Sequence, residues 1–361
     1  MRLTVESADY PLDELCGFGC RANPRRPFVI VSRVLGKHIP VRPRRMVEIH
    51  QTLAKKIPTI PGPVTFIALA ETAVGLGHGI FEEWLTLTGR DDAVFLHTTR
   101  YRLRETLAFS FQEPHSHAPC HLVYEPVEKH CQNLFANAKS LILIDDELTT
   151  GQTLVNLATN YLSYNDRVCQ IIFVSLTDWL GQLRLTLAQR FGIPLRLVSL
   201  LQGSLKFEAN PTFNAPETNA AFACGRGEGY SLQRNYGRLG VSQPISLETR
   251  LLTDRVMSSL GRRLLVLGTG EFAHPPFLLA RLLENAGHDV LFQSTTRSPL
   301  LEGDALGAKL QFMDNYGEGI PNYLYNAGSR DIDDAIIGYE FMAPNSSHDL
   351  PEKLNARCVI F

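Results

Sequence analysis

The stretch LILIDDELTTGQT, residues 141–153, holds the signals from which the fold can be predicted. Four apolar residues lead directly into Asp145 and Asp146, and a run of threonines around Gly151 follows. A short apolar segment that ends at a turn signal is typical of a buried strand in a parallel sheet. The apolar residues after the turn share one stripe of a predicted helix: Leu154, Leu157, Ala158, Tyr161 and Leu162. The segment therefore predicts a strand, a turn and a helix.

Apolar segments of the same kind occur on both sides of this stretch. They are VTFIALA (64–70), DAVFLHTTR (92–100) and VCQIIFVSL (168–176), with helical patterns between them. Strands that alternate with helices predict a parallel α/β sheet with right-handed crossovers. LAFSFQEPHSHAPCHLVYEP (107–126) has apolar arms around a polar tip and predicts a long hairpin.

The length of 361 residues suggests two domains. Residues 203–250 are rich in Gly, Asn, Pro and Arg and lack sustained periodicity, so we expect an irregular extension there. The chain then restarts with a strand at RRLLVLG, a helix at PPFLLARLLENAG and a strand at HDVLFQS. We therefore predict a first domain over residues 1–250 and a second, smaller Rossmann-like α/β domain over residues 251–361.

Composition excludes several classes of protein. The hydrophobic fraction of 44% and the charged fraction of 20% indicate a packed globular chain. The net charge of −2 gives no basic field, so no nucleic acid is expected as a partner. No apolar run reaches the roughly 20 residues needed to span a bilayer, so no membrane is expected. The first residues do not resemble a signal peptide, and seven sparse cysteines suit the reducing cytoplasm. Cys16 and Cys20 are interpreted as structural residues.

The polar residues of the opening stretch form a combination suited to a phosphorylated ribose. In open α/β sheets, ligands bind at the carboxyl ends of strands, and a helix N-terminus there favours an anion. Gly151 lets the backbone close on that anion, and the neighbouring threonines add hydroxyl donors. The carboxylates of Asp145 and Asp146 repel each other unless ribose hydroxyls or a cation lie nearby. The alternative is an ordinary turn capped by Asp and Thr, although capping needs only one such residue.

This motif resembles the 5-phosphoribosyl-1-diphosphate (PRPP) signature of type I phosphoribosyltransferases. The resemblance implies that Asp145 and Asp146 hold and orient the ribose. It implies that the following turn holds the 5-phosphate through Thr149, Thr150, Gly151, Gln152 and Thr153. It also implies Mg²⁺, bound mainly through PRPP, with the two aspartates as further candidate ligands. Such an enzyme transfers the phosphoribosyl group to a nitrogenous base and releases diphosphate, and its relatives commonly form homodimers.

Other landmarks of that family match positions elsewhere in the chain. The loop that follows the first strand of the sheet would bind diphosphate through Ala70, Glu71, Thr72 and Ala73. A basic residue after the next strand would contact the same group. Arg100 is the matching residue, and Arg102 and Arg104 are substitutes. The hairpin tip QEPHSHAPCH would form the hood or lid over the site.

Four zinc-ligand residue types gather at the hairpin tip: His115, His117, Cys120 and His121. They allow a zinc site, an incidental polar loop, or a lid over the diphosphate. Pro119 and the short spacing disfavour one tetrahedral centre. We favour the lid, in which His115 and His117 act catalytically by donating a hydrogen bond or a proton. Glu113 would orient a histidine or contact the base.

The whole chain is similar to a narrower family. RANPRRPFVIVSRVLGKHIPVRP, ALAETAVGLG, QEPHSHA, SLTDW and STTRSP (294–299) resemble phosphoribosyltransferase-like proteins found with bacterial tellurite-resistance and stress genes. Those proteins carry a C-terminal domain named for its Thr-Arg-Ser-Pro motif. The resemblance implies an orotate phosphoribosyltransferase-like first domain and a role in making a nucleotide-like metabolite.

The second domain contains a G-x-G-x-x-A pattern at Gly268, Gly270 and Ala273, which is a dinucleotide fingerprint. However, the next strand ends in Ser-Thr-Thr-Arg rather than in the acid that would bind an NAD ribose. Dinucleotide binding, another phosphate-bearing or acidic ligand, and a structural turn all remain open. We favour the second alternative, and its candidate residues are Gly268, Gly270, Thr295, Thr296, Arg297 and Ser298.

Three functions follow from these patterns. The first is a Mg²⁺-dependent phosphoribosyltransferase with an unidentified acceptor. The second is a non-catalytic protein that senses PRPP or a nucleotide, because fold alone does not establish turnover. The third is an oxidoreductase that uses the second domain. The two acids, the diphosphate loop, Arg100 and the predicted lid favour the enzyme.

Overall fold

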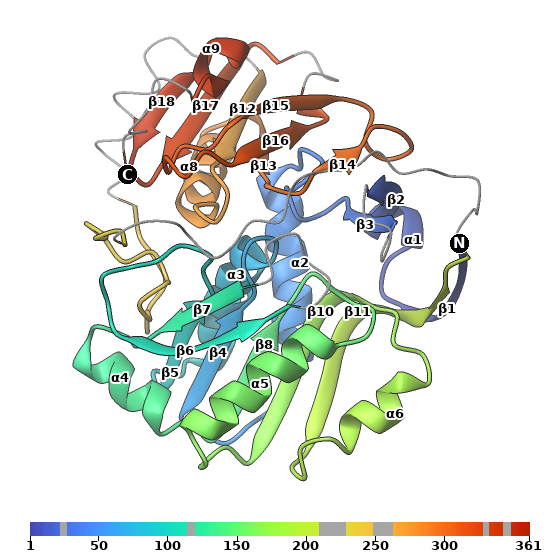
Figure 1. Ribbon diagram of the computed structural model, residues 1–361, viewed down its shortest axis with the longest axis vertical. Helices are drawn as coiled ribbons and strands as arrows, with labels where there is room; N and C mark the ends of the chain where they lie inside the picture. Colours follow the sequence, from blue (N-terminus) through green and yellow to red (C-terminus); the bar gives the residue numbers. More distant parts are fainter. Residues whose placement is uncertain (22–26, 114–119, 209–228, 248–262, 328–331, 342–347) are drawn as a thin grey trace. The chain divides into compact units, whose positions relative to one another are not determined.

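The computed structural model describes residues 1–21, 27–113, 120–208, 229–247, 263–327, 332–341 and 348–361 (Figure 1). These residues form two compact units. The first contains residues 1–12 and the described residues between 49 and 244. The second contains residues 13–48 and those from 245 onward. Residues 13–48 thus pack with the C-terminal part, and the boundary near residue 250 stays a prediction about how the chain divides in sequence.

The first unit is built on a largely parallel sheet. Its strand order is β1-β11-β10-β8-β4-β5, and a short β9 also pairs with β10. The bounds are β1 Arg2–Ala8, β4 Val64–Ala68, β5 Ala93–His97, β8 Ser140–Ile144, β9 Glu147–Leu148, β10 Gln170–Asp178 and β11 Leu195–Lys206. Only β1 is antiparallel to its neighbour in this sheet. The chain runs outward from β4 to β5 and then returns past β4 to β8, so the strand order reverses between β4 and β8.

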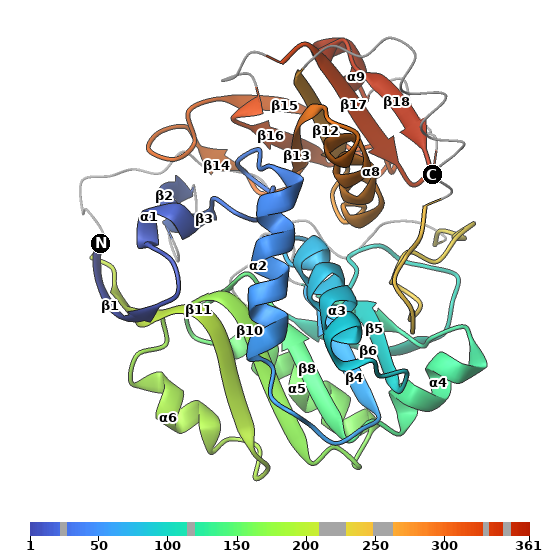
Figure 2. The ribbon, with the colours of Figure 1, turned by 180° about the vertical axis from the view of Figure 1, so that it is seen from behind.

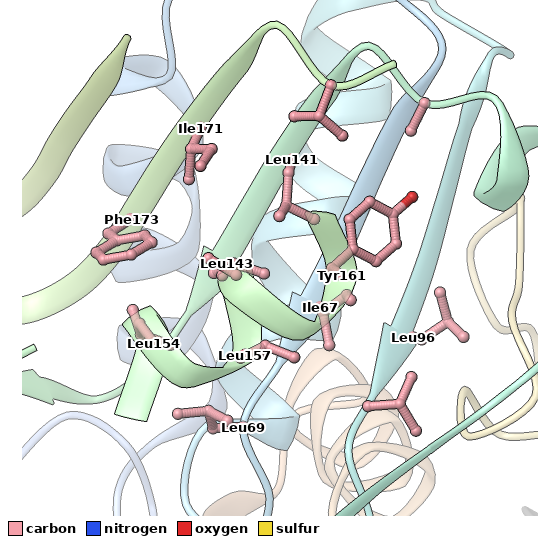
Figure 3. Packing of buried hydrophobic residues seen from close by; sticks show 14 of the residues in the cluster. Ile67, Leu69, Leu96, Leu141, Leu143, Leu154, Leu157, Tyr161, Ile171 and Phe173 are labelled. Carbon is pink, nitrogen blue, oxygen red and sulfur yellow. The ribbon is translucent and has the colours of Figure 1, made fainter. Parts of the chain in front are cut away.

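Helices cover both faces of this sheet. α3 (Val74–Thr88) packs on one face, where Phe66 makes edge contacts with Phe81 and Trp84. α4 (Lys129–Ala136) and α5 (Gln152–Tyr164) contribute to the core on the other face, around Ile67 and Tyr161 (Figure 3). Adjacent strand residues point to opposite faces, which explains why Phe66 and Ile67 belong to different layers. Figure 1 and the reverse view in Figure 2 show α5 and α3 on opposite sides of the sheet.

The predicted strand, turn and helix of the opening stretch are confirmed. β8 ends at Ile144, and α5 begins at Gln152. The predicted helical stripe is buried at Leu154, Leu157, Ala158 and Tyr161, and Leu162 packs against the same cluster. The predicted hairpin is also confirmed in its arms, β6 (Leu107–Gln112) and β7 (Cys120–Tyr124), which pair antiparallel.

The described part of the predicted extension covers the edge of β5. Phe95 and Val241 exchange two backbone hydrogen bonds of 2.8 and 2.9 Å, and His97 N–H donates to Gly237 O at 3.2 Å. An exposed edge strand carries unpaired backbone groups, and this segment satisfies several of them. The prediction placed the start of the irregular region too early, because β11 continues to Lys206.

The second unit is built on a four-stranded parallel sheet with the order β13-β12-β17-β18. Its elements are α8 His274–Asn285, α9 Leu350–Leu354, β12 Arg263–Gly268, β13 Asp289–Ser294, β17 Asp334–Tyr339 and β18 Arg357–Ile360. The remaining elements are α1 Leu12–Leu15, β2 Cys16–Arg21, β3 Phe28–Ser32, β14 Leu300–Leu301, β15 Lys309–Met313 and β16 Pro321–Tyr325. Two further helices among the described residues are α2 Pro43–Lys56, with 14 residues, and α6 Leu183–Ala188, with six. The predicted strand–helix–strand restart is confirmed, whereas a Rossmann-like classification stays a prediction.

The structure bears on what composition suggested about the cysteines and about membrane-spanning segments. Cys16 and Cys20 lie on β2 outside any disulfide, with Cys16 buried and Cys20 exposed. Cys120 is disulfide-bonded, whereas the sparse cysteines were interpreted as fitting a reducing cytoplasm better than a disulfide framework. Across the described ranges, no helix combines the length and the apolar character that a bilayer crossing requires.

Candidate functional site

The candidate site lies where β4 and β8 end. The loop 69–73 follows β4, and Asp145 and Asp146 follow β8 directly. The N–H of Leu69 donates to the carbonyl of Ile144 at 2.9 Å, which holds the two strand ends together. Ligands of open α/β sheets bind at the carboxyl ends of the strands where the strand order reverses. The structure therefore brings the two predicted motifs to the position that favours a ligand.

The two aspartates occupy a bend between β8 and β9. The backbone N–H of Asp145 donates to Val174 O at 3.0 Å, and its Oδ1 accepts the N–H of Asp146 at 2.9 Å. Burial, followed by the charge of Asp146 and a smaller effect of Glu113, raises the pKa of Asp145 well above its ordinary value. The ionised pair is thus unfavourable by itself. Hydroxyl donors or a cation would stabilise it.

The threonine turn places Gly151 at the start of α5. Gly151 has φ of 69°, and as the N-cap residue it makes no side-chain capping bond. In this turn, the N–H of Gln152 donates to Thr150 Oγ1 at 3.3 Å. An ordinary capped turn would place Asp or Thr at the N-cap, so the capping alternative is not supported. The glycine permits the sharp turn, and the helix N-terminus favours an anion.

The loop 69–73 is tied to the neighbouring strand. Ala70 N–H donates to Thr98 Oγ1 at 2.9 Å, and the peptide bond between Ala70 and Glu71 is cis. Ala73 N–H donates to Leu69 O at 3.0 Å, and α3 begins at the next residue. Helix α3 therefore starts immediately after the loop that was predicted to bind diphosphate.

Among the three candidate arginines, Arg100 is the one that contacts this loop. Its Nη2 donates to Ala70 O at 3.3 Å, and its side chain is buried. Arg104 donates instead to Gly229 O at 3.2 Å, and Arg102 is exposed. Arg100 thus lies next to the loop predicted to bind diphosphate, and its contact with the diphosphate itself stays a prediction.

The hairpin brings Glu113 into contact with Arg100 and His121. Glu113 Oε2 lies 3.4 Å from Arg100 Nη2 and 3.3 Å from His121 Nε2. His115 and His117 lie outside the described residues, so their catalytic role in a lid stays a prediction. Two of the four residues of the zinc alternative have other interactions, because Cys120 is disulfide-bonded and His121 contacts Thr98 and Glu113. In the described part of the chain, no cluster of three or more metal-ligand side chains occurs.

Sequence reasoning missed Thr98. This residue follows β5, and its hydroxyl contacts both Ala70 and His121. The signal that could have identified it is its position one residue beyond a buried strand adjacent to β4, at the same edge of the sheet.

Comparison with known proteins agrees with this geometry. The family described as phosphoribosyl transferase matches residues 15–204, which is more than half of the 361 residues. The chain belongs to the phosphoribosyl transferase family. The TRSP domain, described as C-terminal to that transferase domain, matches residues 236–353. The suspected family and its second domain are therefore confirmed, and the fold is an α/β phosphoribosyltransferase with a parallel sheet.

Similar solved structures include adenine phosphoribosyltransferases from three organisms. The Leishmania donovani protein is 15% identical, with 52% of this chain and 77% of that chain covered and a TM-score of 0.35. The Trypanosoma brucei protein is 13% identical, with 55% and 86% covered and a TM-score of 0.37. The Thermoanaerobacter pseudethanolicus protein is 16% identical, with 50% and 93% covered and a TM-score of 0.34. No curated protein matches the chain.

In the TRSP part of this phosphoribosyltransferase, the glycine pattern forms a tight turn. A Cβ on Gly268 would lie 2.7 Å from Phe272 O, and Gly270 N–H donates to Thr295 Oγ1 at 2.8 Å. Prolines stand near the start of α8, at Pro275 and Pro276. Proline has no backbone N–H, so this helix start offers fewer donors to a diphosphate. This geometry speaks against the dinucleotide alternative.

The TRSP motif itself is buried. Arg297 Nη2 lies 3.4 Å from Glu318 Oε2, and Thr296 Oγ1 accepts the N–H of Ser298 at 3.1 Å. The carboxylates of Asp314 and Glu271 also act on Glu318. An anionic ligand at Arg297 would have to replace Glu318 there and would be repelled by the nearby carboxylates of Asp314 and Glu271. Phosphate binding at this motif therefore stays a prediction.

Glu318 should make the stability of the phosphoribosyltransferase depend on pH. Burial raises the pKa of Glu318 from 4.5 to about 7, although Arg297 opposes the shift. Between those pH values, the folded chain keeps a proton that the unfolded chain has lost. The stability contribution is therefore complete below pH 4.5 and is lost as the pH rises through about 7.

We expect Glu318→Gln to remove this decline, which amounts to at most about 3 kcal/mol. Thermal unfolding of wild type and variant across this pH range provides the measurement. Parallel pH profiles for the two proteins would contradict the assignment.

Proposed function

We propose that this phosphoribosyltransferase binds PRPP together with Mg²⁺ at the carboxyl ends of β4 and β8. It transfers the 5-phosphoribosyl group to a nitrogen of a base-like acceptor and releases diphosphate. The observation that carries this proposal is the meeting of two motifs where the strand order reverses. One motif is the aspartate pair with its threonine turn, and the other is loop 69–73 with Arg100.

Each part of the site suits one part of PRPP. Asp145 and Asp146 would accept hydrogen bonds from the ribose diol, which offsets the unfavourable burial of their charge. The turn from Thr149 to Thr153 leads into the N-terminus of α5, where a 5-phosphate is favoured. Backbone groups of loop 70–73 and the Arg100 guanidinium would contact the diphosphate.

Mg²⁺ fits the donor set of this site. Carboxylate and phosphate oxygens are the ligands that this ion prefers, and Asp145 and Asp146 are half-buried acids next to each other. Bound Mg²⁺ would neutralise charge on the diphosphate. Most of its ligands would come from PRPP, with the aspartates as further candidates.

Catalysis would consist mainly of positioning and electrostatic stabilisation. The acceptor nitrogen forms a bond to C1 of the ribose with inversion, and the bond from C1 to the diphosphate oxygen breaks. The diphosphate leaves with the electron pair, and the acceptor nitrogen loses its proton to solvent or buffer. Asp145 and Asp146 hold the ribose during this step, and Arg100 stabilises the departing diphosphate.

The direct test incubates purified protein with PRPP, Mg²⁺ and a panel of nucleobases, and measures diphosphate release. We expect release with at least one base, and much slower release from the Asp145→Asn variant. Release at the wild-type rate from that variant would contradict the assignment of the site. Clear PRPP binding without release for any base would instead favour the sensor, and NADPH binding would favour the oxidoreductase.

The biological setting is part of the same proposal. Resemblance to proteins found with tellurite-resistance and stress genes supports synthesis of a nucleotide-like metabolite in that context. We propose that the protein is a cytoplasmic homodimer, because type I relatives commonly form dimers. Size-exclusion chromatography with light scattering would measure the oligomeric state.

A further inference from the structure

A closed ring of polar contacts joins the diphosphate loop, the strand end after β5 and the hairpin. Ala70 N–H donates to Thr98 Oγ1 at 2.9 Å, and Thr98 Oγ1 lies 2.9 Å from His121 Nδ1. His121 Nε2 lies 3.3 Å from Glu113 Oε2. Arg100 Nη2 donates to that same oxygen at 3.4 Å and to Ala70 O at 3.3 Å. The ring therefore begins and ends on Ala70.

One half of this ring is fixed more firmly than the other. His121 is buried and stacks on Phe111 with ring centroids 4.9 Å apart and an interplanar angle of 7°. Phe111 and His121 are also register partners of β6 and β7. The backbone pairing and the stacking thus hold the imidazole in one orientation, next to Thr98.

The hydrogen-bond pattern is satisfied by a neutral imidazole. Thr98 Oγ1 accepts from Ala70, so its own hydrogen is available to His121 Nδ1. Nε2 then carries the imidazole hydrogen and donates to Glu113. This arrangement orients the Glu113 carboxylate toward Arg100.

The Glu113 contacts form the loose half of the ring. Charge-assisted N–H···O bonds are usually about 2.7–2.9 Å long, whereas both contacts of Glu113 exceed 3.2 Å. Glu113 directly follows the last residue of β6, and its side chain is 27% exposed. A stronger anionic partner could therefore replace Glu113 at Arg100 without disturbing His121.

Glu113 also adds negative charge to the aspartate pair. Its charge is one of the causes that raise the pKa of Asp145, after burial and Asp146. Three carboxylates therefore act on one region that contains the Arg100 guanidinium. An incoming diphosphate would be repelled by Glu113 and attracted by Arg100.

We propose that Glu113 is a positioning residue that holds Arg100 against loop 69–73. When PRPP binds, its diphosphate replaces Glu113 as the anionic partner of Arg100. His121 and Thr98 keep Glu113 and the loop in register during this exchange. The inference rests on the proposed function, because it names the residues that prepare the same site for its donor substrate.

The test measures binding to the intact protein by calorimetry, with Mg²⁺-PRPP and with Mg²⁺ and inorganic diphosphate as separate probes. Glu113→Gln removes the competing charge and keeps the shape of the side chain. We expect both dissociation constants to fall by about three- to tenfold. Loss of a merely structural contact would weaken binding instead. Glu113→Asp, which keeps the charge, should retain affinity closer to that of wild type.

Two controls make the result specific. Glu105→Gln removes the same charge from an exposed residue, and it should leave both constants unchanged. In an Arg100→Met background, the gain from Glu113→Gln should shrink, because the competition for Arg100 is lost and only the direct repulsion between Glu113 and diphosphate is left to relieve. Unchanged or weaker binding by Glu113→Gln would overturn the inference, as would the full gain in the Arg100→Met background or an equal gain from Glu105→Gln. Failure of the wild type to bind PRPP would overturn the proposed function itself.

Discussion

Asp145→Asn is expected to stabilise the free protein by about 1 kcal/mol at pH 7 while it weakens PRPP binding by about 10- to 100-fold. The stabilisation arises because burial, and then the charge of Asp146, raises the pKa of Asp145. At neutral pH the carboxylate is ionised in the unfolded chain more readily than in the folded one. The neutral amide removes this cost, and its oxygen can still accept the N–H of Asp146.

The direction of the pH effect follows from the same shift. A raised pKa means that the stability contribution of Asp145 is complete below its unfolded pKa of 3.8 and is lost as the pH rises through the folded value. The advantage of Asp145→Asn should therefore shrink as the pH falls toward 4. Thermal unfolding at several pH values measures this trend, and a pH-independent difference would contradict it.

The loss of PRPP affinity has a separate cause. Each hydrogen bond from a ribose hydroxyl to a charged carboxylate contributes about 1.5–3 kcal/mol. Replacing both Asp145 and Asp146 by Asn should therefore remove most PRPP affinity and leave the fold intact, as calorimetry and circular dichroism would show. Asp166→Asn is the matched control, because Asp166 is exposed in the turn after α5. Unchanged PRPP binding by the double variant would mean that the donor binds elsewhere.

Gly77→Ala is expected to destabilise the first unit by about 2–3 kcal/mol and to abolish PRPP binding. A Cβ at this position would lie 2.4 Å from Ala68 Cβ and 2.9 Å from Phe95 Cε2, so α3 must shift away from β4 and β5. Helix α3 begins directly after the candidate diphosphate loop. A shift of the helix would therefore displace the loop as well.

The same helix provides the matched control. A Cβ added to Gly75 would have no neighbouring atom within 4 Å. Gly75 lies in the first turn of α3, two residues before Gly77. Alanine there should stabilise the helix by about 0.5–1 kcal/mol, since glycine loses more backbone entropy on folding. Denaturant unfolding of both variants measures the difference. Equal effects of the two substitutions would show that packing against β4 and β5 is not the cause.

Much of the first unit was predictable from local patterns. The segments around residues 64–70, 92–100, 140–146 and 168–176 form the predicted parallel strands. Their apolar runs are short and continuous because both faces of the sheet are covered. The aspartates and threonines adjoin a strand end and a helix start in sequence, so their placement needs no distant contact.

Other parts depend on contacts between distant segments. β1 pairs with β11, although almost the whole first unit separates them in sequence. Residues 13–48 pack with the C-terminal unit, where Lys37 donates to Thr295 O at 2.6 Å. No periodicity within the N-terminal segment indicates such a partner.

The stretch 141–153 shows what local sequence patterns determine and what only the contacts of the folded chain determine. Periodicity and residue chemistry were sufficient to identify a strand, a helix and a phosphoribosyl signature, because each depends on neighbours within a few residues. Folding was needed to bring Asp145 within the electrostatic influence of Glu113, and Arg100 into contact with Ala70, at one end of the sheet. Strand order and hairpin register create those contacts, and both are properties of the packed chain rather than of any single segment.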